Sequence, residues 1–596
     1  STCRHRGACI PAVSGRTVAE ECDGLTGNID DSLADIASFD VIVCGSGAAG
    51  LLAAIRLADQ GLKPLVIEKS ACYGGTSAIS GGGIWVPAHG LSDDGDSYEQ
   101  AMTYLRVVSR GDVREEKLAA YLAAGSETVD YLGEIGVAMT ASPAIPDYID
   151  APGSRSGRSL FPLAIDGSQL GEDFCRLREA PETYRLFGRI AMNLDEGLVL
   201  AMQRRGWIGT VVRLLARYWS DLGWRRKTRI DRRLTMGRAL IGGLLLAMKK
   251  RQISIWLDTS LCRIRHEGDR VVAVDVERHG NRLTLKTPKG LVLAAGGYEQ
   301  NQMLRDRHLP VATDRGWSLT PQSMNEGVSV ASAEELGADT EHMNAFWWAP
   351  SILLPSKRVA NLISAEAMYF DHRHPFSLCV NRLGKRFVNE SCSYDRFGQA
   401  MIADQLATGA NLPCWMIFDW KFRRRFPCGP ILPHGLLPDR RIPPEWWDSY
   451  IFKADSLHSL GRKIGVPSET LMATVERLND FAVTGQDEDF GRGNAAYDRY
   501  FGKPNVKPNP CLGPLDTGPY YAVKIELGDL GTKGGLKTDS VARVMKKDGT
   551  VFDNLYAVGN SAGSPFGDCY PGAGGTLGPA LVFARLAADD LGSRDG

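Results

Sequence analysis

The sequence predicts an α/β fold that begins with a Rossmann-like dinucleotide-binding unit. A strand, a glycine-rich loop and a helix follow one another over residues 40–58, and two further strands that end in glycines are expected at 291–297 and 554–560. The chain has 596 residues, which is too long for one ordinary hydrophobic core. We therefore expect two domains, or one domain interrupted by another.

The first glycine-rich loop joins a buried strand at 40–44 to a helix at 51–58 that is rich in leucine and alanine. Gly45 permits the tight turn, Gly47 lets the backbone approach a pyrophosphate, and Gly50 lets the helix pack closely on the strand. The predicted phosphate loop consists of Gly45, Ser46, Gly47, Ala48, Ala49 and Gly50.

Two features after this loop indicate which dinucleotide is bound. A second strand at 64–67 ends at Glu68, close to the spacing of about 20 residues at which a carboxylate accepts ribose hydroxyls. The segment 74–83 is rich in glycine and hydroxyl groups, which suits contacts along a diphosphate and a flavin ring. Together they indicate FAD.

Later segments complete the predicted cofactor site. Hairpin strands at 271–276 and 282–286 precede the buried strand at 291–293, and a helix starting near residue 575 would point its N-terminus at the flavin pyrimidine. The remaining predicted FAD contacts are Lys69, Gly74, Gly75, Thr76, Ser77, Gly81, Gly82, Leu261, Ala295, Gly296, Gly559, Asn560, Gly575, Thr576 and Leu577.

Composition excludes several classes of protein. The formal net charge of −1 gives no global attraction to nucleic acid, and no apolar run approaches the roughly 18–20 residues that span a bilayer. The 13 cysteines are irregularly spaced, which favours reduced thiols in a cytoplasmic protein. Residues 1–38 contain Cys3, His5, Cys9 and Cys22, but we expect a loosely ordered arm there rather than a metal site.

These motifs together resemble the fumarate reductase and succinate dehydrogenase flavoprotein superfamily over most of 39–591. The resemblance implies a Rossmann-like FAD-binding domain, formed by 39–350 and 530–596, that is interrupted by an α+β substrate-capping catalytic domain at 351–529. Members that attach FAD covalently carry a histidine near the position of Gly75. No histidine occurs there, so the resemblance implies non-covalent FAD.

Three tyrosine-bearing segments resemble, within this superfamily, the 3-ketosteroid Δ1-dehydrogenase family. Residues 569–579 match that family's Tyr-Pro-Gly-x-Gly signature, 384–391 precede a tyrosine at the family's catalytic position, and 146–153 resemble the segment with its auxiliary tyrosine. The aromatic runs at 346–348 and 368–370 are expected either to line an apolar steroid cavity or to pack in the core.

The resemblance assigns four catalytic residues. Desaturation beside a ketone removes a weakly acidic α-proton and transfers a hydride from the β-carbon to flavin N5. Tyr570 and the backbone N–H of Gly574 would hold the developing enolate oxygen. Tyr394 would take the C2 proton, and Tyr148 would donate the hydrogen bond that a tyrosine base needs, because its ordinary pKa is about 10. The expected partners are a 3-ketosteroid and an external electron acceptor such as a quinone.

Three alternatives remain open on the sequence. Desaturation of a 5α-ketosteroid at C4–C5 shares the fold, although Pro571 and Ala573 favour the C1–C2 position. A fumarate or urocanate type of ene-reductase needs arginine and histidine, and the loop around Tyr570 has neither. A membrane-recruited FAD protein without turnover is the third alternative.

A basic segment motivates that third alternative. Residues 201–251 hold 14 lysines and arginines against Asp221 and Asp231, a net charge of +12, and apolar residues recur at helical spacing over 207–219. The unusual part is about 198–233. A basic amphipathic helix with tryptophans can lie on the inner face of a membrane, and a solvated, core-packed excursion is the other interpretation. Nucleic-acid binding is disfavoured because no recognised module accompanies the charge.

Overall fold

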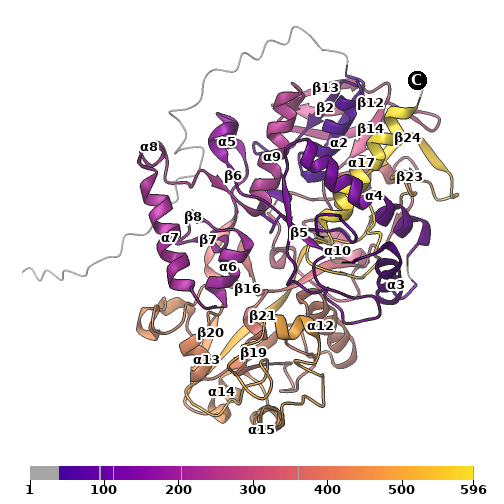
Figure 1. Ribbon diagram of the computed structural model, residues 1–596. Coiled ribbons are helices and arrows are strands. Elements are labelled where there is room, and N and C mark those ends of the chain that lie inside the picture. The colour runs from indigo at the N-terminus through magenta and orange to yellow at the C-terminus, as the bar shows by residue number, and fades with distance from the viewer. Residues whose placement is uncertain are drawn as a thin grey trace, which may run out of the picture.

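The computed structural model describes residues 39–594 apart from 93–94, 112, 203, 322 and 360–361. The predicted arm at 1–38 therefore lies outside the described residues. Two six-stranded sheets organise the fold, and Figure 1 shows the first of them in the upper half of the molecule and the second in the lower half. The α/β fold expected from the sequence is confirmed.

The first sheet carries the dinucleotide-binding unit. Its strand order is β10 (Ser254–Trp256), β2 (Pro64–Ile67), β1 (Val41–Cys44), β14 (Gly290–Leu293), β24 (Val551–Ala557) and β23 (Arg543–Met545). All neighbours are parallel except β23, which runs antiparallel to β24. Every residue of β1, β2 and β14 is buried, as expected for a parallel sheet covered on both faces.

Alternate side chains of the first sheet enter two different cores. Val41, Val43 and Val292 face helices α2 (Ala48–Asp59), α9 (Met236–Lys250) and α17 (Leu577–Ser593). Ile42 and Leu291 face the other core, which includes the small sheet of β11 (Thr259–Glu267), β12 (Arg270–Arg278) and β13 (Asn281–Lys286). The strands predicted at 271–276 and 282–286 are thus confirmed as part of a three-stranded sheet.

The second sheet has the order β17 (Leu362–Ala367), β16 (Phe346–Val359), β21 (Tyr520–Thr532), β19 (Cys414–Phe418) and β18 (Ser377–Val380), with β20 (Ile451–Ala454) also paired to β21. Strand β16 begins at Phe346 and strand β21 ends at Thr532. The sheet therefore extends beyond residues 351 and 529, the predicted bounds of the capping domain. Helix α12 (Tyr394–Thr408) packs on one face, and α14 (Leu457–Ile464) and α15 (Ser468–Thr484) pack on the other.

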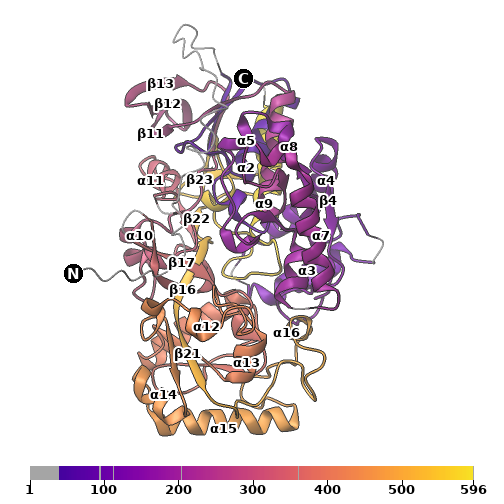
Figure 2. The ribbon, with the colours of Figure 1, turned by 90° about the vertical axis from the view of Figure 1, so that its left-hand side faces the viewer.

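The basic segment forms α6 (Leu194–Ala201), α7 (Trp207–Ser220) and α8 (Leu222–Arg225). The helix predicted at 207–219 is therefore confirmed, and its Leu214 and Tyr218 are buried against Ile190 and Met192. Helix α7 forms the left-hand edge of Figure 1 and faces the viewer in Figure 2. Across the part of the chain described, no helix combines the length and the apolar character needed to cross a bilayer.

The remaining helices and strands connect these units. They are β3 (Ile84–Trp85), β4 (Met139–Ala141), β5 (Ser159–Pro162), β6 (Ile165–Asp166), β7 (Arg185–Leu186), β8 (Ile190–Ala191), β9 (Arg233–Leu234), β15 (Thr340–Glu341), β22 (Gly535–Leu536), α3 (Tyr98–Val108), α4 (Glu115–Glu134), α5 (Asp173–Arg176), α10 (Gln302–His308), α11 (Val328–Glu334), α13 (Trp420–Arg425) and α16 (Ala496–Tyr500). Of these, α16 contributes Tyr497 to the candidate active site.

Candidate active site

The phosphate loop packs too tightly for any residue but glycine at two positions. A Cβ atom on Gly50 would lie 2.0 Å from the carbonyl oxygen of Gly45, and one on Gly45 would lie 2.3 Å from the carbonyl oxygen of Ala294. Gly45 also has φ of +109°. The start of α2 is thereby held against the end of β1, where its first N–H groups have no helical partner and suit a phosphate.

The loop is joined by hydrogen bonds to the other predicted cofactor segments. Both the N–H and the hydroxyl of Ser46 donate to Glu68, at 3.0 and 2.7 Å. Gly74 N–H donates to the Ser46 hydroxyl at 3.0 Å, and Ala48 N–H donates to the Ser77 hydroxyl at 3.1 Å. Segments separated in sequence therefore form one surface, rich in backbone N–H groups and hydroxyls.

Some predicted contacts have protein partners of their own. Lys69 forms an ion pair with Glu326 at 2.8 Å, and Leu261 packs its side chain into the core beneath β11. Gly82 has φ of +68° and approaches the backbone of Met236, where a Cβ would lie at 2.5 Å. The structure therefore gives Lys69 an ion pair and gives Leu261 and Gly82 a packing role, and the predicted cofactor contact of all three stays a prediction.

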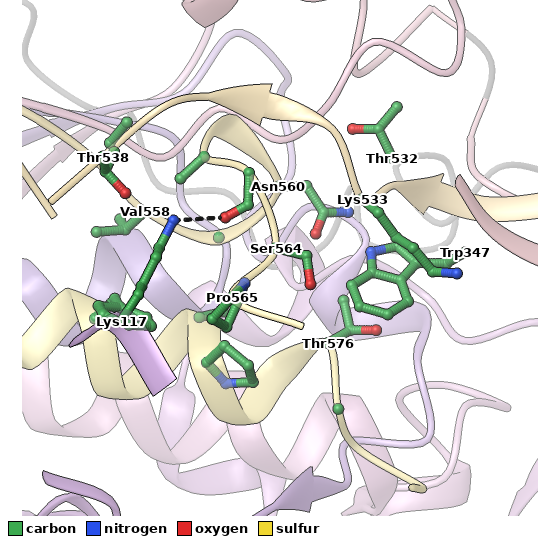
Figure 3. Close-up of a pocket in the computed structure, with 18 residues that line it drawn as sticks. Lys117, Trp347, Thr532, Lys533, Thr538, Val558, Asn560, Ser564, Pro565 and Thr576 are labelled. Carbon is green, nitrogen blue, oxygen red and sulfur yellow. Dashed lines mark hydrogen bonds between the residues drawn. The ribbon is translucent and has the colours of Figure 1, made fainter. Parts of the chain in front are cut away.

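A pocket lies between the end of β24 and the start of α17 (Figure 3). Thr532 and Trp347 line it, and the buried Thr532 Oγ1 and Trp347 Nε1 have no hydrogen-bond partner among the residues described. Such unpartnered polar atoms fit the polar edge of a flavin ring. Four predicted FAD contacts, Gly559, Asn560, Gly575 and Thr576, also line this pocket.

A hydrogen bond joins the ends of two strands of the first sheet near this pocket. The Ser561 hydroxyl donates to the carbonyl oxygen of Gly296 at 3.0 Å, which joins the glycines after β14 to those after β24. Helix α17 begins at Leu577, slightly later than the predicted start near residue 575. The pocket therefore adjoins segments at which we expect the flavin ring.

The structure brings three predicted catalytic tyrosines together from distant parts of the chain. The ring centroids of Tyr148, Tyr394 and Tyr570 lie 5.1 to 5.6 Å apart. The Tyr148 hydroxyl donates to the Tyr394 hydroxyl at 3.1 Å. Tyr394 is the first residue of α12, and Tyr570 precedes α17. These three side chains form a phenol cluster beside the pocket.

The predicted oxyanion turn has a geometry that requires glycine. Gly574 has φ of +100°, and a Cβ on it would lie 2.4 to 2.6 Å from the backbone of Ile84. The Thr576 hydroxyl donates to the Tyr570 hydroxyl at 3.3 Å, and Trp347, which lines the pocket, packs edge-on against Tyr570 at 4.7 Å. The phenol cluster therefore adjoins the flavin pocket through Trp347 and Thr576.

Burial opposes ionisation of the phenol cluster. It raises the pKa of Tyr148 and of Tyr394 well above 10. The phenols of Tyr148 and Tyr570 add to the effect on the pKa of Tyr394, whereas the hydrogen bond with Tyr394 lowers the pKa of Tyr148. Burial also raises the pKa of Tyr570, and the hydrogen bond from Thr576 acts in the opposite direction. The N-terminus of α12, at which Tyr394 lies, supplies positive potential that favours an anion there.

An ion network, buried at Lys533 and Asp395 and exposed at Asp568, connects the start of α12 to the loop before Tyr570. Lys533 Nζ lies 2.9 Å from carboxylate oxygens of both Asp395 and Asp568, and Gln399 donates to Asp395 and to the Asp568 carbonyl at 3.2 and 2.7 Å. Burial raises the pKa of Asp395 to about 6 against the opposing charge of Lys533. This network fixes the relative position of two predicted catalytic tyrosines.

Four apolar side chains around the phenol cluster were not assigned to it by sequence reasoning. Tyr497 of α16 and the following Phe501 pack into it, together with Leu198 of α6 and Met202. Leu198 is the first residue of the basic segment expected at about 198–233, and its side chain, the buried one of α6, also contributes to the active-site wall. The only sequence signal for these residues is their apolar character.

This chain is similar to several known proteins over most of its length. The FAD binding domain family model matches residues 40–577. A 3-oxosteroid 1-dehydrogenase of Mycolicibacterium smegmatis is 37% identical over 93% of this chain and 97% of its own length. A 4-oxocyclohexanecarboxylate 2-dehydrogenase of Sinomonas cyclohexanicum is also 37% identical, over 92% of each. The crystal structure of a 3-ketosteroid delta1-dehydrogenase from Sterolibacterium denitrificans in complex with 1,4-androstadiene-3,17-dione is similar, with a TM-score of 0.89, 40% identity and coverage of 93% of this chain and 99% of that one.

Proposed function

This chain belongs to the family of FAD-dependent 3-oxosteroid 1-dehydrogenases, and from that premise we propose that it introduces a C1–C2 double bond into a 3-ketosteroid. It is an FAD-dependent oxidoreductase. One observation carries the assignment of catalytic residues: the phenol cluster of Tyr148, Tyr394 and Tyr570 lies directly beside a pocket lined by predicted flavin contacts.

The arrangement assigns each side chain one task. The Tyr570 hydroxyl and the Gly574 N–H would hold the C3 carbonyl oxygen, which makes the C2 proton more acidic. Tyr394, hydrogen-bonded by Tyr148, would accept that proton. FAD, when bound, supplies the acceptor for the hydride that leaves C1. We propose that the cofactor is held without a covalent bond by the loop at 45–50.

The apolar lining of the site favours an apolar substrate. The side chains packed around the phenol cluster are Trp347, Phe370, Phe501, Leu198 and Met202. The relative named for 4-oxocyclohexanecarboxylate indicates that the common chemical element is a ring ketone. We therefore propose that this wall selects a polycyclic ketone.

Product analysis tests this assignment. The purified protein would be incubated with a 4-ene-3-ketosteroid, a saturated 5α-3-ketosteroid and 4-oxocyclohexanecarboxylate, with an artificial electron acceptor, and the products identified by nuclear magnetic resonance. We expect the first to become a 1,4-diene. Conversion of only the 5α-steroid to its 4-ene would support C4–C5 desaturation, and conversion of only the small ketone would overturn the steroid assignment.

Replacing Tyr570 by Phe is expected to lower kcat by about 10²- to 10³-fold, because one donor to the developing enolate oxygen is lost. Tyr570 packs against Trp347, and that ring contact survives the change. Steady-state kinetics would measure the effect. Tyr98→Phe on α3 is the matched control, since Tyr98 is surface-exposed. Equal activity of the two variants would contradict the oxyanion role.

We also propose that α7 contacts the inner face of a membrane, from which an acceptor such as a quinone is reached. Ile208, Val212 and Trp219 of α7 and Leu222 at the start of α8 are 59 to 63% exposed, while Leu214 and Tyr218 of α7 are buried. Arg213 lies among them and is also exposed. Exposed apolar side chains beside basic groups support binding to an anionic lipid surface.

Replacing Ile208, Val212, Trp219 and Leu222 by serine is expected to abolish binding to vesicles containing phosphatidylserine, since the inserted apolar surface is removed. Cosedimentation would measure binding, with phosphatidylcholine vesicles to separate the charge contribution. Met303→Ser/Val483→Ser is the control, because both residues are more than 75% exposed on other helices. Unchanged binding of the α7 variant would contradict the proposed contact.

A further inference from the structure

Arg373 is a fully buried arginine in the wall of the active site. It is 1% exposed, and its guanidinium carbon lies 4.8 to 5.5 Å from the ring centroids of Phe370, Tyr497 and Phe501. Its Nη1 donates to the Tyr497 hydroxyl at 2.8 Å. Its Nε and Nη2 have no partner within the part of the chain that the structure describes.

The charge of Arg373 is not balanced by an ion pair. Five arginines among the described residues are less than 2% exposed, and the other four each form an ion pair with a carboxylate: Arg158, Arg305, Arg423 and Arg492. Removing an unpaired cation from water is unfavourable in a protein interior. A negative charge that forms nearby would recover part of this cost.

Arg373 supplies positive charge near the phenol cluster that no ion pair with a neighbouring group cancels. The carboxylate of Asp498 feels the charge, but it accepts hydrogen bonds from Asn389 and the Gly493 N–H instead. Burial lowers the pKa of His372 to about 3, so this neighbour is neutral. Lys533 lowers the pKa of Tyr570, but it is matched by two carboxylates, Asp395 and Asp568, each at 2.9 Å.

A short series of contacts connects Arg373 to the base. The Tyr497 hydroxyl accepts the hydrogen bond from Arg373, and the Tyr497 ring packs 4.8 Å from the ring of Tyr148. Tyr148 in turn donates to Tyr394 at 3.1 Å. The charge of Arg373 opposes the effect of burial on the pKa of both Tyr148 and Tyr497. Tyr394 also contacts the rings of Tyr369 and Tyr570, and a phenol cannot supply positive charge to a neighbouring phenolate.

We propose that Arg373 is a positioning residue whose unpaired charge stabilises the singly deprotonated Tyr148–Tyr394 pair, the form that accepts the C2 proton. This inference rests on the proposed function. The pair releases one proton to solvent before the reaction and regains one from C2. The C2–H electron pair forms the C1–C2 double bond, and the hydride leaves C1 with its own electron pair for the flavin.

The test compares Arg373→Met with Arg373→Lys and Tyr497→Phe in the FAD-loaded protein. Loss of the charge makes the phenolate less stable, so its pKa rises and the rate of flavin reduction reaches its plateau at higher pH. We expect Arg373→Met to move the rising limb of the pH–rate profile upward by about one pH unit. The rate on the acid side of this limb should be about tenfold lower, and KM should be unchanged. Arg373→Lys and Tyr497→Phe keep the charge and should keep the limb.

Each variant can contradict the proposal. An unmoved limb in Arg373→Met, a shifted limb in Arg373→Lys, or a shift in Tyr497→Phe as large as that in Arg373→Met would overturn it. Should Arg373→Met fail to retain FAD, Arg373→Gln carries the same expectation. Ultraviolet titration of phenolate without steroid, with Tyr394→Phe as reference, should show the same shift. Absence of that shift overturns the Arg373 inference, whereas absence of steroid turnover by the wild type overturns the proposed function.

Discussion

Replacement of Tyr394 by Phe is expected to slow flavin reduction by a ketosteroid by about 10³- to 10⁴-fold, at the upper end of the effect of a positioned general base. The variant loses only the hydroxyl that accepts the hydrogen bond from Tyr148. Its ring keeps the edge contacts with Tyr369 and Tyr570. Folding and FAD content should therefore remain close to those of the wild type.

Stopped-flow absorbance would measure this rate under anaerobic conditions. Tyr98→Phe again serves as the matched control, since it removes one phenol hydroxyl from the surface helix α3. A Tyr394→Phe variant that reduces its flavin within tenfold of the wild-type rate would contradict the assignment of this residue as the base. Retention of steroid binding in the variant would show that the loss lies in the chemical step.

Replacement of Gly50 by Ala is expected to abolish FAD binding. A Cβ atom at this position would lie 2.0 Å from the carbonyl oxygen of Gly45, a backbone atom that cannot move without displacing the phosphate loop. The start of α2 would move away from β1, and its N–H groups would no longer meet a pyrophosphate. Flavin absorbance after gel filtration would measure bound FAD.

Gly133→Ala is the matched control for this substitution. Gly133 also lies within a helix, α4, but a Cβ there meets no atom within 4 Å. Alanine in an open helical position is expected to stabilise the helix by up to about 1 kcal/mol. Full FAD content in the Gly50→Ala variant would contradict the assignment of 45–50 as the phosphate loop.

Local sequence patterns predicted the parts of the molecule that local geometry determines. The strand, loop and helix around 41–59 depend on buried apolar runs and on glycines whose spacing has a geometric cause. The phenol cluster was likewise predicted, because Tyr394 and Tyr570 lie in recognisable segments. The hydrogen bond from Tyr148 to Tyr394, which the family resemblance implied, is present in the structure.

Residues without a local signature could not be predicted. Tyr497 and Arg373 are separated by 124 positions, and they meet only because α16 packs against the segment before α12. In the sequence, α6 overlaps the start of a basic amphipathic segment. Periodicity predicts which face of a helix is apolar, but it does not predict the residues against which that face packs. The physical reason in both cases is tertiary packing.

Anaerobic mixing of the FAD-loaded protein with a 4-ene-3-ketosteroid tests the central claim most directly. The account predicts that the absorbance of the oxidised flavin is lost, that one 1,4-diene-3-ketosteroid forms per flavin, and that Tyr394→Phe prevents both changes on the same timescale. Flavin that stays oxidised with every 3-ketosteroid, or that is reduced equally fast in Tyr394→Phe, would contradict it.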